Sequence, residues 1–359
     1  MSNPEAPTKV ISDFEATLTK ADQAVATFER DDRTVIHVLR GFLRRNPTMI
    51  PALVLLLSII AFSIVAPRFL GIGALSTVLK QVTVTGFVAL AQTLVILTAG
   101  IDLSVGAILV ISSLIMGNLA VYSGVPVFLA VIVGLFFGGL MGWVNGVLVA
   151  KVKLPPFIVT LGTLSVFTAL KLWYSQSESI RNVDIEEKAS GLLWFGQGFN
   201  VGGASISYGG ITLILLMLVL WYVLNHTAWG RHVHAIGDDP DAAMLSGIKV
   251  DRTLISVYVV AGLICGFAAW IAIGRVGSVS PIGFETVNLG SITAVVIGGT
   301  SLFGGRGSVI GAVLGAFIVG VFNTGLSLAG VDDYWQMFAA GCLVIVAVAL
   351  DQWLRRASQ

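Results

Sequence analysis

Charged residues are scarce in this sequence. Aspartate, glutamate, lysine and arginine make up 11% of its 359 residues, whereas hydrophobic residues make up 56%. A soluble domain of this length does not need so much apolar surface, but a bundle of membrane-spanning helices does. The net charge of +1 also offers no bulk attraction for nucleic acid. The composition therefore predicts an all-α polytopic membrane protein without a nucleic-acid partner.

Cysteine is almost absent. The two cysteines, Cys265 and Cys342, lie inside apolar runs, so no disulfide framework is expected. Metal-ligand patterns are missing as well, because His232 and His234 are spaced so that both rings do not share one helix face. We therefore expect no metal site and no cofactor. Within the apolar runs, no histidine or acid cluster points to an enzyme.

A phosphate-binding loop is also missing. The pattern Gly-x-x-x-x-Gly-Lys-Ser/Thr does not occur in the sequence. The run from Gly298 to Ser308, GGTSLFGGRGS, has the glycines but no lysine, and it follows an apolar stretch. We interpret this run as a non-helical turn or a break within the membrane, which glycine allows to pack closely.

Residues 1–47 differ from the rest of the chain, since they are polar, charged and poor in glycine. Their scattered acidic residues argue against a signal peptide. Apolar residues recur every three or four positions and form one stripe of a short helix, namely Ile11, Phe14, Leu18, Ala21, Val25 and Phe28. We expect a cytoplasmic N-terminal extension, either an amphipathic helix on the membrane or on a partner, or a weakly ordered tail.

Residues 48–356 form the expected transmembrane domain. Apolar runs in it predict about ten spans, at approximately 49–66, 82–99, 104–122, 127–149, 155–173, 209–225, 253–274, 289–303, 309–328 and 336–353. The eighth run is short and broken by glycine. Most lysines and arginines lie inside if the N-terminus is cytoplasmic. Both termini are then cytoplasmic, residues 226–252 form the largest inner loop, and residues 175–208 form the largest outer loop.

The stretch Leu94–Met116, LVILTAGIDLSVGAILVISSLIM, joins two apolar runs through a short polar break around Asp102. A carboxylate at bilayer depth costs about 2.5–3.5 kcal/mol on insertion scales, so it is usually placed against a cavity or a polar partner. Broken helices with a polar residue also recur at transport sites. Two interpretations remain open: Asp102 faces a solute, or it caps the following helix, with Ser104 in the first turn.

The inner loop 226–252 contains a second informative pattern. Asp238-Asp239-Pro240 is a helix-start signal, and the following DAAMLSG is long enough for one or two helical turns. A short helix with small residues along it offers a smooth surface for docking into a groove. An ordinary connecting loop is the alternative.

The same loop resembles the Glu-Ala-Ala-x-x-x-Gly motif of permeases from ATP-binding-cassette (ABC) importers. The matching positions are Asp241, Ala242, Ala243, Ser246 and Gly247. Further segments resemble bacterial ABC sugar permeases of the ribose, xylose, arabinose and galactose group, among them TLVILTAGIDLSVGA, SITAVVIGGTSLFGGRGSVIGAVLGA and VDDYWQMFAAGCLVIVAVALDQWLRR. The segments LPPFIVTLGT, KLWYSQSE and IGRVGSVSP look closest to fructose-type members. The resemblance covers the membrane part from Met49 to Arg356.

The resemblance implies a multi-pass permease of the bacterial inner membrane that imports a fructose- or ribose-like monosaccharide into the cytoplasm. Its implied partners are an ABC ATPase subunit, a periplasmic sugar-binding protein, a second permease subunit in a homodimer, and membrane lipid. ATP hydrolysis is expected on the separate ATPase, so this chain is not expected to be an enzyme. The five motif positions are then expected to couple the permease to the ATPase, with Gly247 permitting close approach.

Polar or amphipathic residues within the spans are candidates for the sugar route, because such groups either bond between helices or line a polar pathway. The candidates are Gln92, Asp102, Ser104, Trp143, Asn145 and Asn323. The alternative function is an ion-coupled secondary carrier. Such a carrier would need acidic residues in several span cores, whereas only Asp102 is suitably placed.

The expected orientation can be tested by cysteine labelling. In a background without Cys265 and Cys342, intact cells carrying Glu186→Cys should react with a membrane-impermeant thiol reagent, whereas cells carrying Asp241→Cys should not. The physical reason is that position 186 lies in the expected outer loop and position 241 in the inner loop. The reverse pattern would overturn the orientation.

Overall fold

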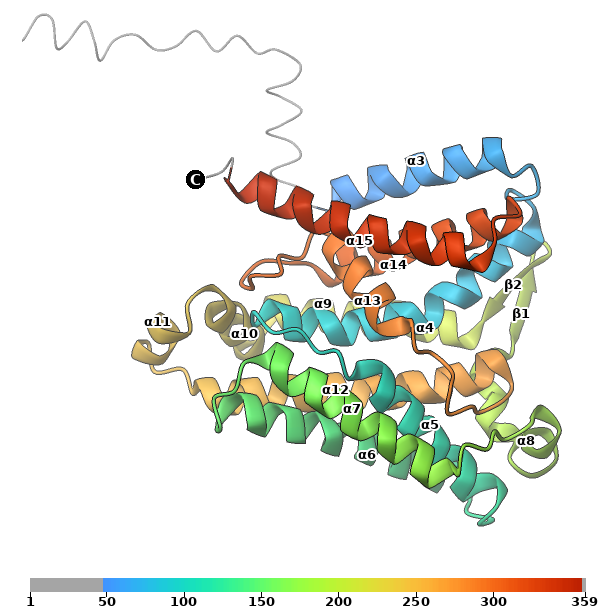
Figure 1. Cartoon of the computed structure of the whole chain (residues 1–359), viewed down its shortest axis with the longest axis horizontal. Coiled ribbons are helices and arrows are strands. Elements are labelled where there is room, and N and C mark those ends of the chain that lie inside the picture. The colour runs from blue at the N-terminus through green and yellow to red at the C-terminus, as the bar shows by residue number, and fades with distance from the viewer. Residues whose placement is uncertain (1–47, 357–359) are drawn as a thin grey trace, which may run out of the picture. The chain divides into compact units, whose positions relative to one another are not determined.

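The computed structural model of the chain describes residues 48–356, so the expected N-terminal extension lies outside the described residues. Within this range ten apolar helices form the bulk of the fold (Figure 1). They are α3 (Met49–Val65), α4 (Ile72–Leu97), α5 (Val105–Val121), α6 (Val127–Ala150), α7 (Pro156–Ser175), α9 (Tyr208–His226), α12 (Val250–Val276), α13 (Val287–Ile297), α14 (Val309–Leu328) and α15 (Asp333–Arg356).

Six of the described helices are long and apolar enough to cross a membrane, namely α4, α6, α7, α9, α12 and α14. The remaining apolar helices, α3, α5, α13 and the first part of α15, are shorter. The predicted class, a helical polytopic membrane protein, is therefore confirmed. Each of the ten expected ranges overlaps one of these helices.

Two boundaries differ from the expected ones. Helix α4 begins at Ile72 rather than near residue 82, because the polar pair Lys80 and Gln81 lies inside the helix instead of before it. Helix α13 ends at Ile297 rather than near residue 303, because the backbone leaves the helix at Gly298 and Gly299, where the latter has a φ of 84°. The apolar composition of these two segments does not indicate where α4 begins or where α13 ends.

The expected outer loop 175–208 contains structure of its own. It holds α8 (Asn182–Lys188), a 3₁₀ helix η1 (Ser190–Gly196) and an antiparallel hairpin of β1 (Gly198–Val201) and β2 (Ala204–Ser207). Gly202 and Gly203 form the two-residue turn with φ values of 59° and 90°. Positive φ at both positions suits the twist of a hairpin. The Ser205 N–H donates to Ser76 Oγ at 2.9 Å, which ties the hairpin to α4.

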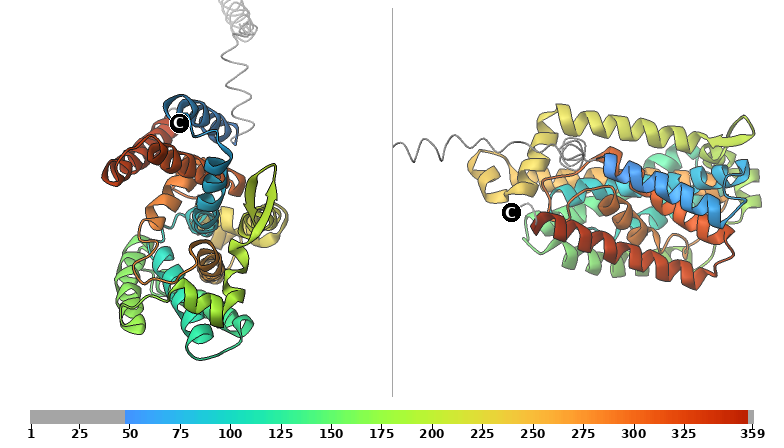
Figure 2. Two further views of the ribbon diagram at one scale, coloured as in Figure 1. Left: turned by 90° about the vertical axis from the view of Figure 1, so that its right-hand side faces the viewer. Right: turned by 90° about the horizontal axis from the view of Figure 1, so that it is seen from above.

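Two short helices lie at the opposite end of the bundle from this hairpin (Figure 1). They are α10 (Ala228–Asp238) and α11 (Pro240–Leu245), which occupy most of the expected inner loop. The right-hand view of Figure 2 shows the same separation from above. We call these two regions the α11 end and the hairpin end. The start of α3 and the end of α15 also lie at the α11 end.

Glycines bring α6 and α12 into close contact, the most extensive helix pairing of the fold. A Cβ added at Gly142 would collide with the Tyr258 carbonyl oxygen, and one at Gly262 would collide with the Gly138 carbonyl oxygen. Small residues at such crossings allow backbones to approach in lipid, where helices gain no hydrophobic driving force by associating. Helices α4 and α5 pack on this pair, and α4 joins it to α13 and α14.

The crossing yields a stability prediction. Gly142→Val should destabilise the protein by about 1–3 kcal/mol, because the added side chain cannot fit against the α12 backbone. Gly162→Val is the matched control, since nothing lies within 4 Å of a Cβ at that helical position. Thermal aggregation in detergent, followed by size-exclusion chromatography, should show a lower midpoint for the first variant only. Equal midpoints would contradict the proposed packing.

Candidate functional site

Helix α11 is the short helix that the Asp-Asp-Pro signal predicts. Asp239 is its N-cap, and one carboxylate oxygen accepts from the N–H groups of Asp241 at 2.9 Å and Ala242 at 3.0 Å. Pro240 occupies the first turn, where its missing N–H costs nothing. At the other end Gly247 adopts a φ of 85°, a left-handed conformation that favours glycine. The sequence therefore fixes both ends of this helix locally.

The surface of α11 is apolar where it is most exposed. Leu245 is 87% exposed and Met244 is 59% exposed, whereas Ala243 is buried against the rest of the loop. Nothing lies within 4 Å of a Cβ at Gly247, so the chain itself needs glycine there for its φ and not for packing. Two large apolar side chains on a capped, projecting helix form a candidate contact for another protein.

Helix α10 connects α11 to two interruptions in the membrane helices. His234 Nδ1 lies 3.0 Å from the Gly305 carbonyl oxygen, and the Gly305 N–H donates to the Leu97 carbonyl oxygen at 3.0 Å. A Cβ at Gly237 would collide with that same carbonyl oxygen. Leu97 ends α4, and Gly305 belongs to the turn between α13 and α14. Thus α10 contacts the α4 end and the 298–308 turn together.

The break between α4 and α5 spans residues 98–104, and side chains satisfy its exposed backbone groups. The Gln92 amide donates to the Asp102 carbonyl oxygen and accepts from the Asp102 N–H, both at 3.1 Å. Thr160 Oγ1 donates to the Ile101 carbonyl oxygen at 2.9 Å. Backbone groups freed at membrane depth need such partners, since lipid supplies none.

The Asp102 carboxylate is only 1% exposed and belongs to a buried network. Its Oδ1 accepts from the Ser104 N–H and from Ser104 Oγ, both at 2.7 Å. Asn145 Nδ2 donates to Ser104 Oγ at 2.8 Å and lies 3.4 Å from Asp102 Oδ2. The carboxylate thus accepts from the backbone N–H two residues further along and stabilises a local turn, as aspartate commonly does in loops.

The expected helix-cap role of Asp102 needs correction. The N-cap of α5 is Ser104, which was expected to lie one position or more inside the helix, in its first turn. The Ser104 side chain makes no cap hydrogen bond. The Gly106 N–H, in the first turn, donates instead to Asn288 Oδ1 at 2.6 Å. Asn288 lies at the start of α13, so a distant helix supplies the cap while Asp102 stabilises the preceding turn.

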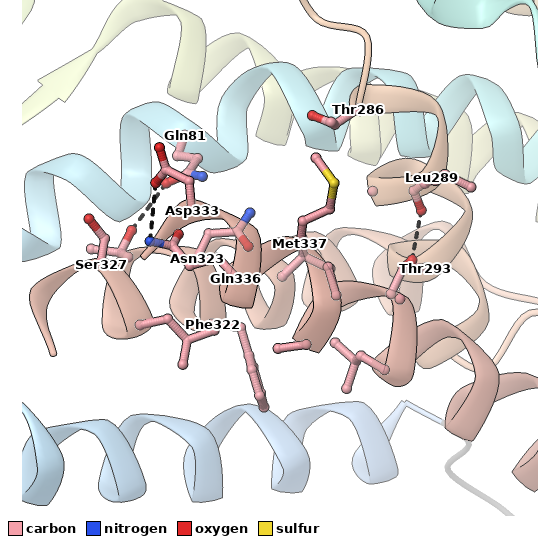
Figure 3. A pocket seen from close by; sticks show the side chains of 18 of the residues that line it. Gln81, Thr286, Leu289, Thr293, Phe322, Asn323, Ser327, Asp333, Gln336 and Met337 are labelled. Carbon is pink, nitrogen blue, oxygen red and sulfur yellow. Dashed lines mark hydrogen bonds between the residues drawn. The ribbon is translucent and has the colours of Figure 1, made fainter. Parts of the chain in front are cut away.

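A cavity of about 720 Å³ lies between α4, α13, α14 and α15, toward the hairpin end (Figure 3). Several polar side chains line it, namely Thr77, Gln81, Thr286, Thr293, Asn323, Thr324, Ser327, Asp333 and Gln336. Thr324 Oγ1 donates to Gln81 Oε1 at 3.1 Å, and Gln336 Nε2 donates to the Val331 carbonyl oxygen at 2.8 Å. The cavity has the size and mixed lining of small-molecule sites.

The six sequence-based route candidates fall into three places. Gln92, Asp102, Ser104 and Asn145 meet in the buried network at the break. Trp143 is 48% exposed on α6, and Asn323 lines the cavity. The structure therefore brings four candidates together and separates the other two from them.

Sequence reasoning missed three polar residues that the structure makes prominent. Asn288 falls just before the expected eighth span, and Gln81 falls just before the expected second span. Gln336 begins the expected tenth span but did not stand out among the polar residues at its start. A polar amide at the edge of an apolar run was the available signal.

The buried network predicts different results for two substitutions of Asp102. Asp102→Asn keeps an acceptor for Ser104, and its amide can donate to Asn145 Oδ1, which has no partner among the described residues. Asp102→Ala leaves the Ser104 N–H unpaired, which costs about 1–3 kcal/mol for a buried group. We expect near-normal thermal stability and sugar uptake for the first variant and loss of both for the second. Equal loss in both variants would mean that the charge itself is required.

Comparison with known proteins agrees with the resemblance seen in the sequence. Residues 74–348 match the family described as branched-chain amino acid transport system / permease component. The chain is 52% identical to the fructose import permease protein FrcC of Rhizobium meliloti over 96% of both chains. It is 41% identical to the ribose import permease protein RbsC of Bacillus subtilis, over 84% of this chain and 92% of the relative.

The ribose import permease protein RbsC of Escherichia coli K12 is 36% identical over 88% of this chain and 96% of its own. No solved structure gives a significant match. The expectation of a sugar permease, and not an enzyme, is confirmed. The chain therefore belongs to the permease components of carbohydrate-uptake ABC importers, whose ATPase is a separate subunit.

Proposed function

We propose that this permease imports fructose into the cytoplasm, driven by an ABC ATPase that docks on α11. The fold supports this through one observation above all: an exposed apolar helix is joined by α10 to both interruptions of the membrane helices. A neutral sugar carries no charge on which the membrane potential could act, so uphill import needs a separate energy source. The 52% identity to a fructose import permease supports fructose as the cargo.

The α11 end is proposed to be cytoplasmic. All ten apolar helices are proposed to act as spans, which leaves the start of α3 and the end of α15 on the same side as α11 (Figure 1). Basic residues are frequent in the segments next to α11 and in the 298–308 turn, as they are on cytoplasmic faces, namely Arg231, Lys249, Arg252 and Arg306. Residues 1–47 would then lie on the cytoplasmic side of the bacterial inner membrane, and the hairpin end would lie on its periplasmic side.

Coupling is proposed to run through α10. A partner groove that holds Met244 and Leu245 would move α11, which Asp239 and Pro240 make a defined unit. Because α10 contacts the Leu97 carbonyl oxygen and the 298–308 turn, the same motion would reach α4, α5, α13 and α14. ATP binding and hydrolysis would thereby change the relative stability of inward-open and outward-open states.

The buried network is proposed to shape the route without touching the sugar. Gln92, Asp102, Ser104 and Asn145 are each at most 1% exposed, so a passing solute would not meet them in this conformation. Asp102 is the only acidic side chain buried among the described residues. A relay of carboxylates, which an ion-coupled carrier would use, therefore has no support from the described part of the chain.

The partners are proposed from the same family membership. A second copy of this permease would complete the membrane unit, with lipid around it and exposed Trp143 on its surface. A periplasmic sugar-binding protein would deliver the cargo to the hairpin end. Reconstitution of the permease with its ATPase and binding protein in liposomes, followed by ATP-dependent uptake of labelled fructose, tests the whole proposal. Absence of uptake with fructose-loaded binding protein would overturn fructose as the cargo.

The coupling role can be tested at Gly247. Gly247→Arg places a large side chain at a position with φ of 85° on the proposed docking surface, so ATP hydrolysis should no longer respond to loaded binding protein. Gly247→Asn is the control, because asparagine tolerates the left-handed conformation. We expect it to keep most of the response, with both variants inserted at normal levels. A normal response from the inserted arginine variant would exclude this loop as the coupling element.

A further inference from the structure

The polar groups of the cavity gather where three helices approach the hairpin end. Gln81 comes from α4, Asn323 and Thr324 come from the last turns of α14, and Asp333 and Gln336 come from the first turn of α15. Figure 3 shows the side chains of Gln81, Asn323, Asp333 and Gln336 close together on one side of the cavity. Segments far apart in the sequence thus build one polar wall.

This wall has hydrogen-bonding capacity that the chain does not use. Gln81 accepts from Thr324 through Oε1, and its Nε2 donates to no group among the described residues. The Asn323 amide has no hydrogen-bond partner among them either, although Asn323 is half-buried. Gln336 Nε2 donates to the Val331 carbonyl oxygen at 2.8 Å and to Asp333 Oδ1 at 3.5 Å, whereas Gln336 Oε1 stays available. The wall therefore offers both donors and acceptors, which is the pattern that sugar hydroxyls need.

The charge of the cavity favours a neutral ligand. Asp333 is the only charged residue among the described residues that line it, and no lysine, arginine or histidine is among them. A phosphorylated sugar or a sugar acid would meet a carboxylate and no cation, so such ligands are disfavoured. A neutral polyol can instead donate to Asp333 and exchange hydrogen bonds with the amides.

The rest of the lining explains why binding there would be weak. The lining also includes Val319, Met337 and Leu343, whose side chains offer no hydrogen bonds to a sugar. A volume of about 720 Å³ lies within the range of small-molecule sites and leaves room for water beside one monosaccharide. Few direct contacts and retained water allow a cargo to leave as readily as it enters.

We propose that this cavity is the site at which the permease receives a neutral monosaccharide, with Gln81, Asn323 and Gln336 as its hydrogen-bonding residues. The proposal rests on the orientation given above, in which the hairpin end faces the periplasm. A lipid chain or a helix of a second copy could fill the cavity instead, and the experiments below distinguish these occupants from a sugar.

The first experiment removes the free amides. The double variant Gln81→Leu with Asn323→Leu should lower ATP-dependent fructose uptake in proteoliposomes about tenfold, because the lost hydrogen bonds are not replaced. Asn225→Leu is the matched control, since it removes an amide from apolar helix α9 outside the cavity, and it should retain wild-type uptake. ATP hydrolysis stimulated by loaded binding protein should persist in both. Uptake by the double variant within twofold of wild type would overturn the proposal.

The second experiment does not depend on uptake. Ser327→Cys, made without Cys265 and Cys342, places a thiol in the cavity. A membrane-impermeant thiol reagent added outside should label it, and millimolar fructose should slow labelling severalfold, whereas glucuronate should not. Glu186→Cys, on exposed α8 in the loop at the hairpin end, is the control, and fructose should leave its labelling unchanged. Absence of labelling at position 327 would show that lipid or a second copy fills the cavity.

The outcomes separate this proposal from the proposed function. Wild-type uptake with ATP tests the importer, whereas labelling at Ser327→Cys tests the cavity alone. Normal wild-type uptake together with unprotected labelling would leave the importer intact and overturn the cavity as the sugar site. Protection by fructose without ATP-dependent uptake would support the site and overturn the proposed energy coupling.

Discussion

The structure depends on how it satisfies backbone groups where its membrane helices are interrupted. In lipid each free N–H or C=O needs a partner from the protein. Gln92 bonds to both backbone groups of Asp102, Thr160 bonds to Ile101, and the Gly305 N–H bonds to Leu97. These bonds come from α4, α7 and the 298–308 turn. The break at residues 98–104 therefore holds distant helices in fixed relation to one another.

Glycines stand where two backbones come into direct contact. Close backbone approach at the α6–α12 crossing, and again where Gly237 meets Leu97, leaves no space for side chains. Such contacts are stiff, because neither backbone can yield by changing a rotamer. A stiff contact between α10 and the membrane breaks suits a protein whose inner loop must transmit motion. Packed interfaces convert small shifts into changes between discrete arrangements.

The two ends of the bundle carry different candidate contact sites. The α11 end carries a capped helix with exposed apolar side chains, whereas the hairpin end carries a cavity with unused amides. The buried network around Asp102 lies at the break between α4 and α5, and it is closed to solvent in this conformation. This arrangement separates energy input from cargo contact. An importer that receives its sugar from a binding protein needs only weak contacts of its own along the path.

The sequence by itself determined the membrane class, the approximate apolar ranges, the family and the helix that starts at Pro240. These features are local, because hydropathy and an Asp-Pro cap act within a few residues. Only the tertiary structure decided that Asn288 caps α5 from 182 residues away, and that Gln81 joins Asn323 and Gln336 in one cavity. Helices in lipid can pack by many faces with similar apolar surfaces, so a single sequence does not reveal which polar groups meet.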